Sequence, residues 1–247
     1  MVQETAKGWR LKAAESSYAR FRERAGGFAP RTPARGEPPD INALLDACRR
    51  LGGRAPDLVA VDMPLALTPI TGRRASDLAI SRAFGAAKAA THSPSALRPG
   101  RLADELRADF VREGFALCTA EGVKTPGVME VYPHAALLAL SGDKVRLTYK
   151  AGKTTTYWRN AELNVRRARL REVWRRIVDL LDAEIAGVAD APPPPLDEAR
   201  GRALKDYEDR LDAVVCAYVA IRALDGGAKP YGDGGSAIWV PNPASLR

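Results

Sequence analysis

The stretch DLVAVDMPLALTP, residues 57–69, places a carboxylate at the end of a short apolar run. The apolar run Leu58–Val61 predicts a strand that is buried on both faces of a sheet. Pro64 lacks the backbone N–H that a sheet requires, so this strand should end at Asp62. An acid in this position either caps a turn or lines a site, because ligands of open α/β sheets bind at the carboxyl ends of the strands.

The composition is that of a soluble globular protein with excess positive charge. Its 247 residues suffice for one large domain or two small ones, and the formal net charge is +8. No apolar stretch is long enough to cross a membrane and the first residues lack the apolar core of a signal peptide, so we expect a cytoplasmic protein with no membrane partner. Three widely spaced cysteines and two histidines disfavour a zinc site or a disulfide framework.

Strand and helix patterns alternate along the chain, which predicts an α/β fold. The expected elements are strands over 8–13 and 17–23, a helix over 41–51, a strand over 58–61, helices over 71–90 and 101–122, a strand over 127–132, helices from 133, over 160–185 and up to 224, and a closing strand over 236–241. Residues 190–198, DAPPPPLDE, read as a stiff linker.

Glu130 repeats the arrangement of Asp62. It lies near the end of the expected strand over 127–132, and Pro133 stops that strand. If the two strands are parallel neighbours, both carboxylates open onto the same edge of the sheet. Both acids are therefore candidate site residues.

A third acid lies within the apolar stretch YEDRLDAVVCAYVAI, residues 207–221. Asp212 shares a helical face with Glu208 and Asp209, and the helix is apolar nearly all round from Leu211 onward. We therefore expect Asp212 to be buried, which is costly for a charge without a partner. The partner is either an arginine, in a structural ion pair, or a divalent cation shared with the strand-end acids, for which oxygen ligands favour magnesium or manganese.

Positive charge is concentrated between Arg146 and Arg176. This window holds ten basic residues against two acids, Glu162 and Glu172. A local field of this kind suits a polyanion such as nucleic acid. The solvated face of an arginine-rich helix would show the same pattern.

Five short motifs, taken in order, resemble the domain-of-unknown-function family 429. They are VDMPLA, GRRASD, EVYP, LTYK and EDRLDAVVCAYVA, and the resemblance covers most of the chain, from the strand before Asp62 to IWVP near the C-terminus. Members of this family are predicted nucleases of the ribonuclease H-like fold. The resemblance implies one domain over residues 1–247, with a central mixed sheet flanked by helices and with mostly helical, basic insertions over 72–122 and 142–190. It also implies that acids at strand ends and on the last core helix bind Mg²⁺ or Mn²⁺ for phosphodiester hydrolysis.

The resemblance also assigns roles to individual residues. The implied metal ligands and catalytic groups are Asp62, Glu130, Asp209 and Asp212. The implied phosphate-binding residues are Arg73, Arg74 and Lys150. For the two arginines, an ion pair with Asp77 is the structural alternative.

The first strand departs from the family pattern. The family opens with a central strand that resembles GVD, whose Asp is the principal metal ligand. Here Gln3 takes the position of that Asp, and Glu4 lies beside it as a further candidate ligand. Either the true start lies upstream, or the ligand has been lost or replaced by Glu4, since the amide of Gln3 offers a hard cation only a neutral oxygen.

The sequence favours a magnesium-dependent hydrolase that acts on nucleic acid or on a smaller phosphodiester. The first alternative is an inactive nucleic-acid-binding or interaction scaffold that keeps the basic surface. The second alternative is a phosphotransferase of the related actin-like fold, against which we find no paired glycine-rich phosphate loops.

Overall fold

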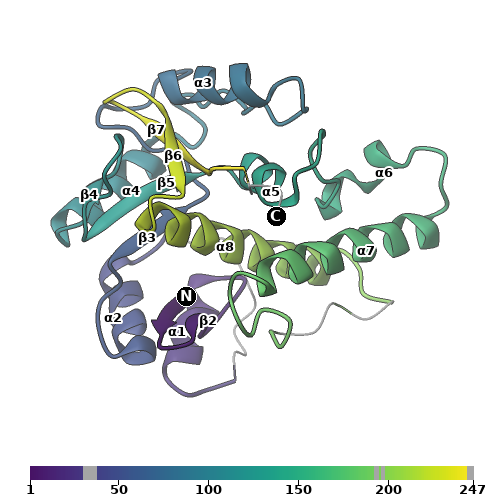
Figure 1. Ribbon diagram of the computed structural model, residues 1–247, viewed down its shortest axis with the longest axis horizontal. Coiled ribbons are helices and arrows are strands. Elements are labelled where there is room, and N and C mark those ends of the chain that lie inside the picture. The colour runs from purple at the N-terminus through teal and green to yellow at the C-terminus, as the bar shows by residue number, and fades with distance from the viewer. Residues whose placement is uncertain (30–37, 192–194, 196–197, 244–247) are drawn as a thin grey trace.

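A five-stranded, mostly parallel sheet forms the centre of the protein (Figure 1). The computed structural model describes residues 1–29, 38–191, 195 and 198–243. Across the sheet the strands are β3 (Leu58–Val61), β5 (Gly127–Val131), β7 (Ala237–Pro241) and β6 (Ala228–Gly232), and the short β4 (Ala116–Leu117) also pairs with β5. β3, β4 and β7 run parallel to β5, whereas β6 runs antiparallel to β7. The expected α/β class is confirmed, and β3 and β5 meet the condition of being parallel neighbours.

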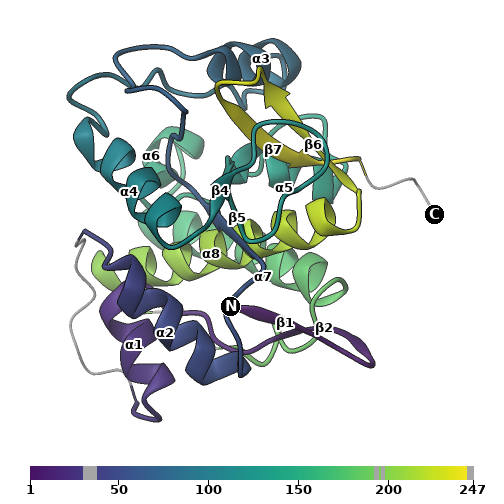
Figure 2. The same cartoon turned by 90° about the vertical axis from the view of Figure 1, so that its left-hand side faces the viewer.

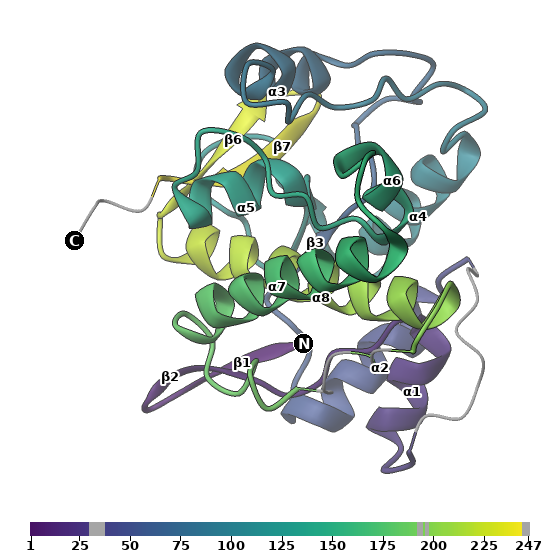
Figure 3. The same ribbon diagram turned by 90° about the vertical axis from the view of Figure 1, so that its right-hand side faces the viewer.

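Helices cover both faces of this sheet. On one face α8 (Arg202–Leu224) shares a core with α7 (Leu163–Asp182), and the two helices lie side by side in Figure 3. On the other face α2 (Ile41–Gly52) and α4 (Arg101–Arg112) pack on β3 and β5. The remaining helices are α1 (Tyr18–Ala25), α3 (Ala75–Phe84), α5 (Pro133–Ser141), the short α6 (Thr154–Tyr157) and the 3₁₀ turn η1 (Ala151–Lys153).

Side-chain alternation along β3 and β5 decides which helices the strand-end acids face. Val61 pairs with Glu130, so both side chains lie on the face that packs against α4. Asp62 follows Val61 and turns to the opposite face, where Ala60 and Met129 pack with α8. The two acids therefore share an edge of the sheet, as expected, but not a face.

The first two strands form a hairpin outside the five-stranded sheet (Figure 2). β1 (Val2–Thr5) pairs only with β2 (Gly8–Leu11) among the residues that the structure describes. Within β1, Gln3 donates from Nε2 to the carbonyl oxygen of Gly52 over 3.1 Å, and Glu4 is exposed. The central first strand that the resemblance implies is therefore not what residues 2–5 form.

Several elements differ from the expected ones, and local features account for three of them. Residues 17–23 form most of α1 rather than a strand, because the Ser17 hydroxyl accepts the N–H of Arg20 and caps a helix. α4 ends well before residue 122, because Gly114 takes a positive φ of +85°. β6 lies in a glycine-rich segment without a strand pattern and is held by its pairing with β7.

The two segments expected as mostly helical insertions contain helices and one short strand. Residues 72–122 carry α3, α4 and β4, and residues 142–190 carry η1, α6 and α7. Of the expected linker over 190–198, residues 192–194 and 196–197 lie outside the described part of the chain. Within that described part, no helix combines the length and apolarity needed to span a membrane.

Candidate functional site

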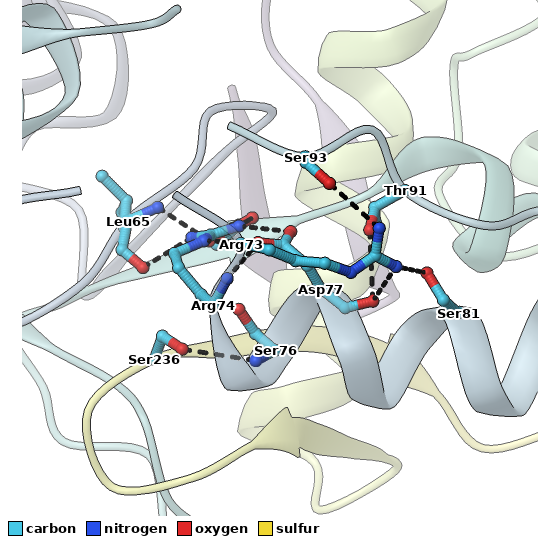
Figure 4. A network of polar contacts seen from close by, with 10 residues as sticks. Leu65, Arg73, Arg74, Ser76, Asp77, Ser81, Thr91, Ser93 and Ser236 are labelled. Carbon is cyan, nitrogen blue, oxygen red and sulfur yellow. Dashed lines mark hydrogen bonds and ion pairs between the residues drawn. The ribbon is translucent and has the colours of Figure 1, made fainter. Parts of the chain in front are cut away.

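A buried arginine, Arg74, lies between the carboxylates of Asp77 and Glu130 at the edge of the sheet, and we name these three residues the guanidinium cluster. Figure 4 shows Arg74 with Asp77 and Leu65. Arg74 donates from Nη2 to Glu130 Oε1 and to Asp77 Oδ1, each over 2.8 Å, and from Nη1 to Glu130 Oε2. The N–H of Leu65 donates to Glu130 Oε2 over 2.7 Å, and the carbonyl oxygen of Leu65 accepts from Arg74 Nη1 over 2.8 Å. Arg74, Asp77 and Glu130 are only 8%, 1% and 4% exposed. Both carboxylate oxygens of Glu130 are therefore already in use.

This geometry is that of a structural ion pair. Burial lowers the pKa of the Arg74 guanidinium, but the hydrogen bonds to Glu130 and Asp77 raise it above its ordinary value. The sequence assigns Arg74 to phosphate and Glu130 to metal, whereas the structure places the two in contact with each other. For Arg74, the alternative of an ion pair with Asp77 is present.

Arg73 differs from its neighbour because it is exposed. It donates to Ser93 Oγ over 3.0 Å and to the carbonyl oxygen of Asp77 over 3.3 Å, and it also contacts Ser81 Oγ (Figure 4). None of these partners is charged, so the charge of the Arg73 guanidinium is not neutralised by them. It remains accessible to an anion.

A second polar cluster lies on one stripe of α8. Glu208, Asp209 and Asp212 each offer a carboxylate oxygen, and the three oxygens lie within 4.8 Å of one another. Lys205 donates from Nζ to Glu208 Oε1 over 2.8 Å and to Asp209 Oδ1 over 2.6 Å. Helical spacing brings these side chains together, since residues three, four and seven positions apart share a face. We name these four residues, together with Lys150, the α8 cluster.

The LTYK motif and the residue after it supply the remaining contacts of this cluster. Lys150 donates from Nζ to Asp212 Oδ2 over 2.6 Å and lies 3.5 Å from Glu208 Oε1. The Tyr149 hydroxyl donates to Asp212 Oδ1 over 2.7 Å, and the N–H of Ala151 donates to Glu208 Oε2 over 2.6 Å. The buried Asp212 is thus held by a lysine and a tyrosine and not by the arginine that a structural ion pair predicts. Lys150, expected at phosphate, contacts acids instead.

Asp62 faces the α8 cluster from the end of β3. Its side chain is exposed and makes no hydrogen bond or ion pair with the residues that the structure describes. Desolvation by the surrounding protein and then the charge of Asp212 raise the pKa of Asp62 from 3.8 to about 7, while Lys150 and Lys205 act in the opposite direction. Asp62 is therefore open to a ligand and still within electrostatic range of the α8 acids.

The structure brings Asp209 and Asp212 together on α8 and places Asp62 within electrostatic range of both. Glu130 is separate from them, because it belongs to the guanidinium cluster on the other face. Glu4 lies on the hairpin, outside this region of the sheet. The sequence analysis assigns no role to Lys205 or Tyr149, and it gives Glu208 only a place in a motif. Their positions were a usable signal, because Lys205 and Glu208 lie within one helical turn of Asp209. Tyr149 directly precedes Lys150.

The basic segment begins beside this site and extends along α7. Arg169 and Arg175 are exposed, and neither has an ion pair or side-chain hydrogen bond in the described part of the chain. In contrast, Arg176 pairs with Asp143 over 2.8 Å, and Arg166 donates to Thr155 over 2.9 Å. Part of the positive charge on α7 is thus uncompensated.

The comparisons with known proteins give a family and no activity. Residues 4–234 match the family described as protein of unknown function (DUF429), and this range includes both clusters. No curated protein and no solved structure matches the chain, so no relative supports the ribonuclease H-like arrangement that the resemblance implies. The match covers most of the 247 residues, and the chain therefore belongs to the DUF429 family.

Proposed function

We propose that the protein is a divalent-metal-dependent hydrolase of phosphodiester bonds whose metal is held by Asp62 and the acids of α8. The observation that carries this proposal is the group of three carboxylates on α8, with Asp62 within electrostatic range of them on the face of the sheet that packs against this helix. With Glu208 included, four carboxylates face two ammonium groups in the described part of the chain, those of Lys150 and Lys205. When all four carboxylates are ionised, two negative charges remain, which equals the charge of one divalent cation.

The donor set is chemically suited to Mg²⁺ or Mn²⁺. All the ligands are carboxylate oxygens, which hard cations prefer. Asp62 is exposed and Asp209 half-buried, which leaves room for the waters that Mg²⁺ retains. Contacts from Tyr149 and Ala151 hold the buried carboxylates of Asp212 and Glu208 in fixed orientations. When bound, the cation would supply a water of lowered pKa and stabilise the leaving oxygen.

The guanidinium cluster has a positioning role in this proposal. Arg74 and Glu130 bind the carbonyl oxygen and the N–H of Leu65, three residues after Asp62. They therefore fix the turn that carries Asp62 to the edge of the sheet without contacting the metal. Arg73 is the arginine of the GRRASD motif that is free to meet a phosphate oxygen.

We further propose nucleic acid as the substrate, because the α8 cluster is continuous with the basic segment. Ala151, which contacts Glu208, opens η1, and α6 and α7 follow directly. The uncompensated Arg169 and Arg175 on α7 would attract a phosphate backbone toward the acids. A phosphodiester hydrolase needs such a surface, since its acids alone repel the substrate.

A nucleic-acid-binding scaffold without catalysis is the second candidate. It is favoured by the placement of Gln3 and Glu4 on a separate hairpin, away from Asp62. It is also favoured by the two lysines, because they already compensate part of the acidic charge. In this case the basic surface of α7 would bind a polyanion and the α8 cluster would be structural.

Titration calorimetry with MnCl₂ or MgCl₂, together with cleavage assays on single-stranded and duplex DNA and RNA, separates the two candidates. The hydrolase proposal expects cation binding by the wild type, a loss of binding in Asp62→Asn and Asp212→Asn, and cleavage that needs the cation. Glu4→Gln is the matched control and should leave binding and cleavage unchanged. Salt-dependent nucleic-acid binding without cation binding or cleavage would leave only the scaffold.

A further inference from the structure

Lys205 differs from Lys150 in how firmly the protein holds it. The Lys205 side chain is 50% exposed, and the ion pairs it makes are with Glu208 and Asp209 of its own helix. The Lys150 side chain is 22% exposed, lies 4.6 Å from the centre of the Tyr149 ring and bonds the buried Asp212. Lys205 can turn out into water by rotating its own side chain, because the buried Glu208 would still keep Lys150 and the N–H of Ala151. Moving Lys150 would instead leave the buried Asp212 without a cation.

Lys205 also lies on the carboxylates that a cation needs. Its ammonium group contacts oxygens of Glu208 and Asp209, which are two of the three carboxylates within 4.8 Å of one another. A dication among these oxygens would repel an ammonium group at the same place. A bound dication and the Lys205 ammonium group therefore cannot both keep close contacts with Glu208 and Asp209.

We propose that Lys205 is an internal competitor for the cation. With no dication bound, Lys205 pairs with Glu208 and Asp209 and compensates part of their charge. The dication takes the place of Lys205 when it binds, while Lys150 stays on Asp212. This inference rests on the proposed function and adds a property of the chain itself: the lysine weakens cation affinity and keeps the acids from repelling one another in the cation-free protein. Metal occupancy would therefore depend on the concentration of free cation.

The test is the affinity of the full chain for Mn²⁺, measured by calorimetry, in the wild type and three variants. Lys205→Met should tighten Mn²⁺ binding by roughly 5- to 30-fold, as expected from releasing two partly exposed ion pairs. Lys205→Arg keeps the charge and should leave the affinity within about twofold of the wild type or weaken it. Lys144→Met removes an exposed lysine that has no side-chain hydrogen bond or ion pair with the described residues, and it should leave the affinity unchanged.

A second readout follows the lysine itself. Acetylation of Lys205 by an amine-reactive reagent, followed by mass spectrometry, should become faster when Mn²⁺ is saturating, and acetylation of Lys150 should not. Mn²⁺ binding that is equally tight in Lys205→Met and the wild type, or Lys205 labelling that ignores Mn²⁺, would overturn the inference and leave the proposed function intact. Absence of Mn²⁺ binding in both proteins would overturn the two together.

Discussion

The two polar clusters at the edge of the sheet compensate buried negative charge in different ways. In the guanidinium cluster one planar arginine reaches both carboxylates, and backbone groups of Leu65 complete its bonding. In the α8 cluster two lysines share three acids, one lysine is half exposed, and Asp62 beside them has no partner among the described residues. A guanidinium with rigid donors gives a closed, structural arrangement, whereas ammonium groups on flexible stems can be exchanged. The first cluster therefore stabilises the fold, and we propose that the second is the one available for function.

The largest expected effect is the loss of the arginine from the closed cluster. Arg74→Met leaves Glu130 and Asp77 buried without a counterion, which should lower the free energy of unfolding by about 3–5 kcal/mol. Urea unfolding followed by circular dichroism measures this change. Arg73→Met, the matched control, removes an exposed arginine and should cost less than about 1 kcal/mol. Similar losses in both variants would contradict the distinction between the clusters.

Glu130→Gln is expected to have the next largest effect. The substitution keeps the shape of the side chain but removes the charge that Arg74 contacts with two nitrogens, at a cost of about 2–3 kcal/mol. Asp62→Asn, at the end of the neighbouring strand, should cost nothing measurable in the same unfolding experiment. If the reverse order were found, Glu130 would be the exchangeable acid and the proposed metal set would have to include it.

Tyr149 contacts the α8 cluster through Asp212, and Tyr149→Phe tests how firmly its hydroxyl holds the Asp212 carboxylate in one orientation. The variant loses one hydrogen bond to a charged acceptor while Lys150 still compensates the charge, so we expect a loss of about 1.5 kcal/mol. Cation affinity should also fall by a few-fold, because Asp212 becomes free to rotate. Tyr18→Phe is the control, since Tyr18 is exposed and no hydrogen bond of its hydroxyl is found among the described residues. Equal stability of Tyr149→Phe and the wild type would mean that the hydroxyl does not orient Asp212.

Much of this arrangement can be predicted from the sequence. The register in which the strands pair cannot be predicted. The apolar runs and proline stops correctly place β3 and β5, and the polar interruption of the last helix correctly predicts a buried Asp212. The sequence does not predict which face of the sheet Glu130 lies on, because every residue of β5 is buried and no alternation of polar and apolar residues marks the two faces. Only the pairing of Val61 with Glu130 decides it, and pairing register is a property of the folded sheet.

The partners of the acids are equally hidden from sequence reasoning. Among 38 lysine and arginine side chains, nothing local singles out Arg74 for Glu130 or Lys150 for Asp212, since these pairs are joined by long-range packing. Lys205 is the exception. It precedes Glu208 and Asp209 by three and four residues, a spacing at which helical side chains meet, so its contacts could have been predicted from the helix alone.

The smallest expected effect is the pH dependence that Asp62 adds to stability. Its pKa in the folded protein, about 7, lies above the ordinary value of 3.8, because desolvation and Asp212 disfavour the charged form. The folded state therefore binds this proton more tightly than the unfolded state, so the stabilisation is complete below the lower pKa and is lost as the pH rises through the higher one. Because Asp62 is exposed, solvent screening should keep the change below about 1 kcal/mol.

Unfolding free energies of the wild type and Asp62→Asn without divalent cations, at about pH 5 and about pH 8, measure this effect. The asparagine cannot ionise, so the stability of the wild type relative to the variant should fall between the two pH values. Saturating Mn²⁺ should reverse the trend, since a cation favours the ionised carboxylate of the wild type and binds the variant poorly. A relative stability that does not change with pH and does not respond to Mn²⁺ would mean that Asp62 is a solvated turn residue, and the open cluster would then be as purely structural as the closed one.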